Sequence, residues 1–85
     1  MKEFTYTIKD AVGIHARPAG QLAKLAKGLG STITITKGDR TVNVTQLMKL
    51  MGMGIKCGDT VIFKIEGGDE EASANAIEEF MNANL

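Results

Sequence analysis

The sequence predicts an α+β fold in two layers, with helices packed on one face of a four-stranded antiparallel sheet. Three observations predict it. Four stretches alternate apolar and polar residues, which is typical of strands with one buried face. Two longer stretches repeat apolar residues at helical spacing, and a short apolar segment ends in glycines. The resulting order is βαββαβα, and strands with a single apolar face need cover on one side only.

The four predicted strands share an apolar side chain at every second position. They occupy residues 2–8, 31–37, 40–44 and 60–66, and the sequence KGDR between the second and third predicts a hairpin turn. The side chains expected to point inward are Phe4, Tyr6, Ile8, Ile33, Ile35, Val42, Val44, Val61, Phe63 and Ile65.

Three segments are predicted as helices. The first runs from Pro18 to Leu29. The second is a short apolar helix that Thr45 is expected to cap and Gly52 or Gly54 to end, and the third follows Asp69, a good N-cap. The residues expected on the buried stripes of the two longer helices are Ala19, Leu22, Ala23, Ala26, Leu29, Ala74, Ile77 and Met81.

Length and composition restrict the classes of function. The 85 residues are expected to form one domain, residues 1–85, and ten basic residues balance ten acidic ones without a block of like charge. That balance argues against a dedicated nucleic-acid binder. One histidine and one cysteine, Cys57, cannot build a zinc site, so neither a metal nor another cofactor is expected. The first ten residues do not resemble a signal peptide, and no apolar run approaches the length that spans a membrane, so we expect a cytoplasmic location.

The stretch His15-Ala16-Arg17-Pro18 holds the only histidine and the only proline of the chain. A proline is tolerated in the first turn of a helix, so His15 is expected at or just before a helix N-terminus. Free N–H groups and the positive end of the helix dipole favour anions there. Arg17 adds a permanent charge whose planar fork suits phosphate oxygens.

This surrounding suits a phosphoryl group bound to the His15 ring, because its new negative charge would meet the helix N-terminus and Arg17. The stretch has no second base, no acidic metal ligands and no glycine-rich phosphate loop. It could therefore pass on a phosphoryl group without selecting a nucleotide or small substrate, as a carrier does. A histidine beside a helix start is more often a plain surface residue or a cap, and the residues alone leave that alternative open.

The short segment from Leu47 to Met53 is apolar on nearly every side. Leu50 is expected in the core, but two helical turns on one side of a sheet cannot bury every side chain. We therefore expect an exposed apolar patch, and methionine is adaptable enough to meet different partners.

The sequence GIHARPA, residues 13–19, resembles the active-site signature of the HPr family, the histidine-containing phosphocarriers of the bacterial phosphotransferase system. The similarity extends through TITITKGDRTVNV and LMKLMGMGIKCGDTVIFKIEGGDEEAS to nearly the whole chain. It implies an open-faced β-sandwich of four antiparallel strands and three helices.

The resemblance also implies partners and roles. Enzyme I, charged by phosphoenolpyruvate, would phosphorylate His15 on Nδ1, and the IIA units of sugar permeases would receive the group. Arg17 would assist the transfer, within the phosphate-stabilising helix start formed by Ala16, Arg17 and Pro18. The residues implied in docking the partner enzymes are Leu47, Met48, Met51 and Gly20. The chain would then be a stoichiometric carrier and not itself an enzyme, and a carrier that docks transiently is expected to be a monomer.

Many Gram-positive members of this family carry a regulatory serine where this sequence has Gln46. An amide cannot accept a phosphoryl group from a serine kinase, so that control is expected to be absent. Two other classes stay open at this point. One is a regulatory module that only docks, which would have no need of His15. The other is a small metal-binding or nucleic-acid-binding domain, which the lone His15, the lone Cys57 and the zero net charge disfavour.

Overall fold

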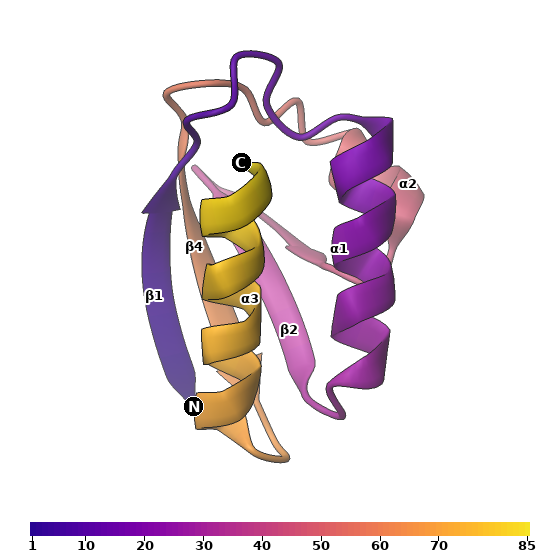
Figure 1. Cartoon of the computed structure of the whole chain (residues 1–85), viewed down its shortest axis with the longest axis vertical. Helices are drawn as coiled ribbons and strands as arrows, with labels where there is room; N and C mark the ends of the chain where they lie inside the picture. Colours follow the sequence, from indigo (N-terminus) through magenta and orange to yellow (C-terminus); the bar gives the residue numbers. More distant parts are fainter.

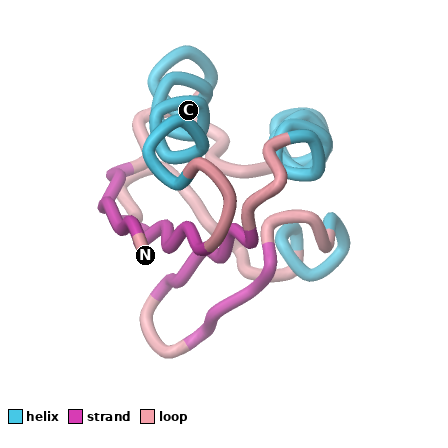
Figure 2. The backbone as a smooth tube through the Cα atoms, turned by 90° about the horizontal axis from the view of Figure 1, so that it is seen from below, coloured by secondary structure: helices cyan, strands magenta, loops and turns pink.

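All seven predicted elements occur in the predicted order in a computed structural model that describes residues 1–85. The strands are β1 (Lys2–Thr7), β2 (Thr32–Lys37), β3 (Arg40–Asn43) and β4 (Thr60–Glu66). The helices are α1 (Ala16–Gly28), α2 (Leu47–Met51) and α3 (Glu70–Asn84), and all three lie on one side of the sheet (Figures 1 and 2). The α+β open-faced sandwich is therefore confirmed.

The sheet is antiparallel throughout, with the strand order β1-β4-β2-β3. The last strand in sequence thus lies between the first and the second. Phe63 of β4 is paired with Phe4 of β1 on one side and with Ile35 of β2 on the other. This register places the apolar side chains of three strands in rows on one face, and the Phe4 and Phe63 rings stack with centroids 5.1 Å apart.

The core lies between that face and the helices. Every strand residue expected to point inward is buried except Phe4, which is half-buried and packs against the core. The predicted helix stripes are buried as well, apart from the half-buried Leu29 at the end of α1. The Tyr6 hydroxyl donates a hydrogen bond to the carbonyl of Met81, 3.0 Å away, so its polar atom is satisfied inside the core.

Two helix starts differ from the prediction. Helix α1 begins at Ala16 and not at Pro18. Pro18 is the third residue of the helix, where a backbone N–H would have no intrahelical partner, so the N–H that proline lacks is not missed and the helix can start before it. The expected cap of α2 by Thr45 is wrong: Gln46 occupies the N-cap position and no side chain caps the helix. Thr45 lies one residue before the N-cap and is held in a local turn instead, since the Asn43 Oδ1 accepts hydrogen bonds from the Thr45 hydroxyl at 2.7 Å and the Thr45 N–H at 2.9 Å.

The other helix ends agree with the sequence. Gly52 is the C-cap of α2, and the Asp69 carboxylate caps α3 by accepting from the Ala72 N–H at 3.1 Å. None of the three helices combines the length and the apolar character that crossing a membrane requires.

Candidate functional site

His15 is carried by the loop between β1 and α1, and local hydrogen bonds fix the shape of that loop. The Asp10 carboxylate accepts from the N–H groups of Val12 and Gly13 at 3.0 and 3.1 Å. Ile14 is buried, and its N–H donates to the carbonyl of Ile55 at 3.0 Å. The residues just before His15 are therefore held against the segment that precedes β4, and the residues after it are held by α1.

Gly13 makes this close approach possible. Its φ is +82°, a conformation that residues with a Cβ rarely adopt. A Cβ at this position would lie 2.5 Å from Cα of Lys56 and closer still to the carbonyl oxygen of Ile55. The glycine thus supplies both the backbone conformation and the space that let the loop lie against residues 55 and 56.

His15 is the N-cap residue of α1, with extended backbone angles of φ −118° and ψ −173°. Its carbonyl accepts the hydrogen bond of the Ala19 N–H at 2.9 Å, but its side chain makes no capping bond. The imidazole is exposed and makes no hydrogen bond elsewhere in the chain. The alternative in which this ring serves as a helix cap is therefore wrong, and the ring is free to react or to bind.

The N-terminus of α1 is an unneutralised positive end. The N–H groups of Ala16 and Arg17 have no hydrogen-bond partner, and the first turn contains no acidic residue. The Arg17 guanidinium is exposed and pairs with no carboxylate. Helix α3 shows the opposite arrangement, since the Asp69 carboxylate caps it and Glu70 and Glu71 lie in its first turn. The positive end of α1 is thus left available to an external anion.

The expected exposed apolar patch is present on α2. Leu50 is fully buried, while Met48 is 79% exposed, Met51 37% and Leu47 36%. We call Leu47, Met48 and Met51 the α2 patch. Helix α2 packs against α1, the helix whose N-cap residue is His15 (Figure 1). Gly20 is half-buried on α1, and nothing lies within 4 Å of the place where its Cβ would be.

One exposed apolar residue near His15 was not predicted. Val12 is 64% exposed, three positions before the histidine and in the same loop. The only signal in the sequence was an apolar residue within a predicted loop. Because a loop has no periodic pattern, that residue type does not indicate whether the side chain is buried or exposed.

Basic and acidic residues are equal in number over the chain, but they lie on different helices. Helices α1 and α2 carry one arginine and three lysines and no acidic residue, whereas α3 carries four glutamates and no basic residue. The basic residues of α1 and α2 are Arg17, Lys24, Lys27 and Lys49, and all are exposed. The surface formed by α1 and α2, which carries His15 at one end and the α2 patch, is therefore positive, which composition alone did not reveal.

Other reactive groups are not brought to His15. No cluster of three or more His, Cys, Asp or Glu side chains is placed to bind a metal ion. The one surface hollow lies along α1, and its lining residues are Gln21, Lys24, Leu25, Gly28 and Leu29. Cys57 is exposed, with Sγ 3.8 Å from the carbonyl oxygen of Lys9. The site is thus one ring and one guanidinium on an open surface.

Comparison with known proteins relates this arrangement to one family. The family model "PTS HPr component phosphorylation site" matches residues 2–83. The chain is 38% identical over 81 residues to phosphocarrier protein HPr of Mycoplasma capricolum subsp. capricolum, covering 95% of this chain and 91% of that protein. It is also 38% identical over 85 residues to phosphocarrier protein HPr of Mycoplasma genitalium, covering 99% and 97%. The crystal structure of HPr-C-His from Thermoanaerobacter tengcongensis superposes with a TM-score of 0.92 at 35% identity, covering 98% of this chain and 93% of that one.

Proposed function

Because the chain belongs to the HPr family of phosphocarrier proteins, we propose that it accepts a phosphoryl group on Nδ1 of His15 and passes it on. The donor is enzyme I of the phosphotransferase system, charged by phosphoenolpyruvate, and the acceptors are the IIA units of sugar permeases. The protein is then a stoichiometric carrier on which partner enzymes act.

The observation that carries this proposal is the state of the His15 ring. It is exposed, makes no hydrogen bond within the chain, and stands at a helix N-terminus without any acidic residue in the first turn. A ring used for packing or capping would be buried or bonded. A plain surface histidine would be exposed as well, but the acid-free helix N-terminus next to this ring and the match to the HPr phosphorylation-site family favour a reacting one. A ring that must meet a donor and then an acceptor has to be open to both.

On this chain, the transfer step needs only the His15 ring as the nucleophile. The lone pair of Nδ1 attacks phosphorus, a nitrogen–phosphorus bond forms, and the bond between phosphorus and the donor group of enzyme I breaks. The ring proton stays on Nε2. In the second step a nucleophile of the acceptor attacks the same phosphorus, and the electron pair of the broken bond returns to Nδ1, which restores the neutral ring.

The start of α1 stabilises the phosphorylated state. The free N–H groups of Ala16 and Arg17 and the positive helix end favour the charge that the phosphoryl group brings. The Arg17 guanidinium is within the same turn and has no carboxylate to compete for it. Pro18 supports the geometry, since it occupies the first turn without leaving a further N–H unpaired.

Partner enzymes dock on the surface beside the His15 ring, which the α2 patch and Gly20 form. The α2 patch offers exposed, adaptable apolar side chains, and the open space over Gly20 lets a partner approach α1 closely. The basic residues around them suit partners whose docking surface is acidic.

Labelling with phosphoenolpyruvate tests the proposal. Incubation with enzyme I and labelled phosphoenolpyruvate should give acid-labile, base-stable label, and His15→Ala should abolish it. Gln21→Ala, an exposed change on the same helix, is the matched control and should label like the wild type. Failure of the wild-type protein to incorporate label would refute phosphoryl carriage and favour a regulatory module that acts by docking alone.

We also propose that serine-kinase control is absent. Gln46 is exposed at the start of α2 and has no hydroxyl, and the hydroxyl of the neighbouring Thr45 already donates to Asn43. Incubation with an HPr serine kinase and ATP should leave residues 45–51 unmodified. Gln46→Ser is the informative control, because it supplies the missing acceptor in the same position. Phosphate on a hydroxyl of the wild-type segment would contradict this proposal.

A further inference from the structure

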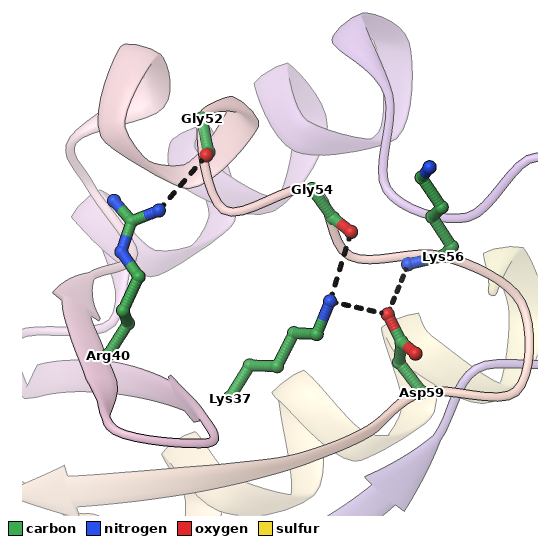
Figure 3. A network of polar contacts seen from close by, with 6 residues as sticks. All are labelled: Lys37, Arg40, Gly52, Gly54, Lys56 and Asp59. Carbon is green, nitrogen blue, oxygen red and sulfur yellow. Dashed lines mark hydrogen bonds and ion pairs between the residues drawn. The ribbon is translucent and has the colours of Figure 1, made fainter.

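Two cations of the β2–β3 hairpin bind the backbone that follows α2 (Figure 3). The Arg40 guanidinium donates to the carbonyl of Gly52 at 3.2 Å, and the Lys37 ammonium donates to the carbonyl of Gly54 at 3.1 Å. Lys37 also pairs with the Asp59 carboxylate at 2.8 Å, and that carboxylate accepts from the Lys56 N–H at 2.8 Å. We call Lys37, Arg40 and Asp59 the clasp.

The clasp acts on a segment without regular structure. Residues 52–56, the connector, join α2 to the turn before β4. Met53 and Ile55 of the connector are buried in the core. The clasp binds the carbonyls of the residues that precede them, Gly52 and Gly54. Gly54 has φ +65°, so the connector turns at the point where Lys37 holds it.

The connector also touches the loop of His15. The Ile55 carbonyl accepts the hydrogen bond of the Ile14 N–H, and Gly13 lies directly against Ile55 and Lys56. One short segment therefore carries the α2 patch at one end and supports the residue before His15 at the other. The position of α2 relative to the loop of His15 is therefore fixed by this segment together with the packing of α2 on α1.

Helix α2 needs such support because it is only five residues long. An isolated helix shorter than about 12 residues is marginal in water. No side chain caps its N-terminus, and only Leu50 of its residues is buried. A cation at the C-terminal carbonyls of a helix is favourable, and Arg40 supplies one from a neighbouring element at Gly52, the C-cap of α2. Lys37 holds the chain two residues further on, at Gly54.

We propose that Lys37, Arg40 and Asp59 are positioning residues for phosphoryl transfer, which hold the α2 patch at the distance from His15 that a docked partner requires. The inference rests on the proposed function. Without the clasp, fewer molecules have patch and ring in the docking geometry, so the apparent affinity for the partner falls in proportion. Once docked, the His15 chemistry is the same, so KM rises and kcat does not change.

Two variants of opposite charge separate positioning from simple attraction. Lys37→Met removes a positive charge and Asp59→Asn removes a negative one, yet both break the same ion pair. We expect each to raise the KM of enzyme I for the carrier about fivefold at unchanged kcat, on the scale of an exposed ion pair. Lys37→Arg keeps the donor and should restore the wild-type KM. Lys64→Met, on the uncovered face of the sheet where Lys64 makes no hydrogen bond or ion pair, is the matched control.

The result that overturns the inference is a KM that rises in Lys37→Met and falls in Asp59→Asn, since charge attraction to an acidic partner predicts opposite effects. Unchanged KM in both variants overturns it as well. Amide exchange gives a reading that does not depend on transfer: the Gly52 N–H, bonded to Met48 within the α2 turn, and the Ile14 N–H should exchange faster in both variants. Unchanged exchange at both amides refutes the positioning role even if the wild-type protein takes up no phosphoryl group.

Discussion

Replacing Gly13 by alanine should destabilise the protein more than any other single methyl group added to its surface loops. Gly13 has φ +82° and lies against the backbone of Ile55 and Lys56. The new Cβ would be 2.5 Å from Cα of Lys56, and backbone atoms cannot rotate away as a flexible side chain can. The loop that carries His15 must therefore move or the connector must move.

The expected cost has two parts. Placing an L-residue with a Cβ in the left-handed region costs about 1–2 kcal/mol. Relieving an overpacked contact by shifting backbone costs about 1–3 kcal/mol more. The sum, about 2–5 kcal/mol, corresponds to a fall in Tm of at least about 8 °C for a domain of this size.

Thermal and urea unfolding followed by circular dichroism measure this change directly. Gly20→Ala is the matched control, because it adds the same methyl group within α1 where nothing lies within 4 Å. That variant should be more stable than the wild type by about 1 kcal/mol, which is the helix propensity difference between glycine and alanine. The two substitutions are chemically identical and have opposite expected signs.

A Gly13→Ala protein that melts within about 2 °C of the wild type would show that the loop does not depend on this close approach. The reasoning about how His15 is positioned would then be wrong, because it depends on the same contact. If the variant is destabilised as expected but still folded at 25 °C, its transfer rate should also fall, since the loop that holds His15 has been displaced.

Three further predictions concern α2 and the ion pairs. Met48→Glu should weaken transfer from enzyme I without lowering Tm by more than a few degrees, because Met48 is 79% exposed; an unchanged transfer rate would argue against docking through α2. Leu50→Ala, on the same helix, should instead lower the free energy of unfolding by about 2–5 kcal/mol in urea titrations, because Leu50 is fully buried, and a change below 1 kcal/mol would contradict its place in the core. The hydrogen bonds from Lys37 to Asp59 and from the N-terminal amine to Glu70 lower the pKa of both carboxyls. Their stabilisation is present above the ordinary carboxyl pKa of about 4 and is lost as pH falls through the lowered values. Asp59→Asn and Glu70→Gln should each flatten the acid side of the stability profile, and profiles parallel to the wild type would refute these pairings.

Local features of this protein were determined by the sequence. The alternation in residues 2–8 and 60–66 and the Asp69 cap depend on side chains a few positions apart, so the pattern already contains the physical cause. The same holds for His15, whose place at a helix start follows from the proline three residues later.

Contacts between distant residues were decided by the tertiary structure. The placement of β4 between β1 and β2 depends on pairings such as Phe63 with Phe4 and Ile35, which no local pattern specifies. Thr45 has the residue type of a helix cap, but in the folded chain its hydroxyl donates to Asn43 Oδ1 and does not cap the helix.

The surroundings of the site belong to the tertiary structure as well. Which apolar residues of α2 stay exposed depends on how the helix lies against α1, and Lys37 reaches the connector only because the hairpin folds beneath it. A sequence records which groups are available, whereas their distances are set by the packing of elements far apart in the chain.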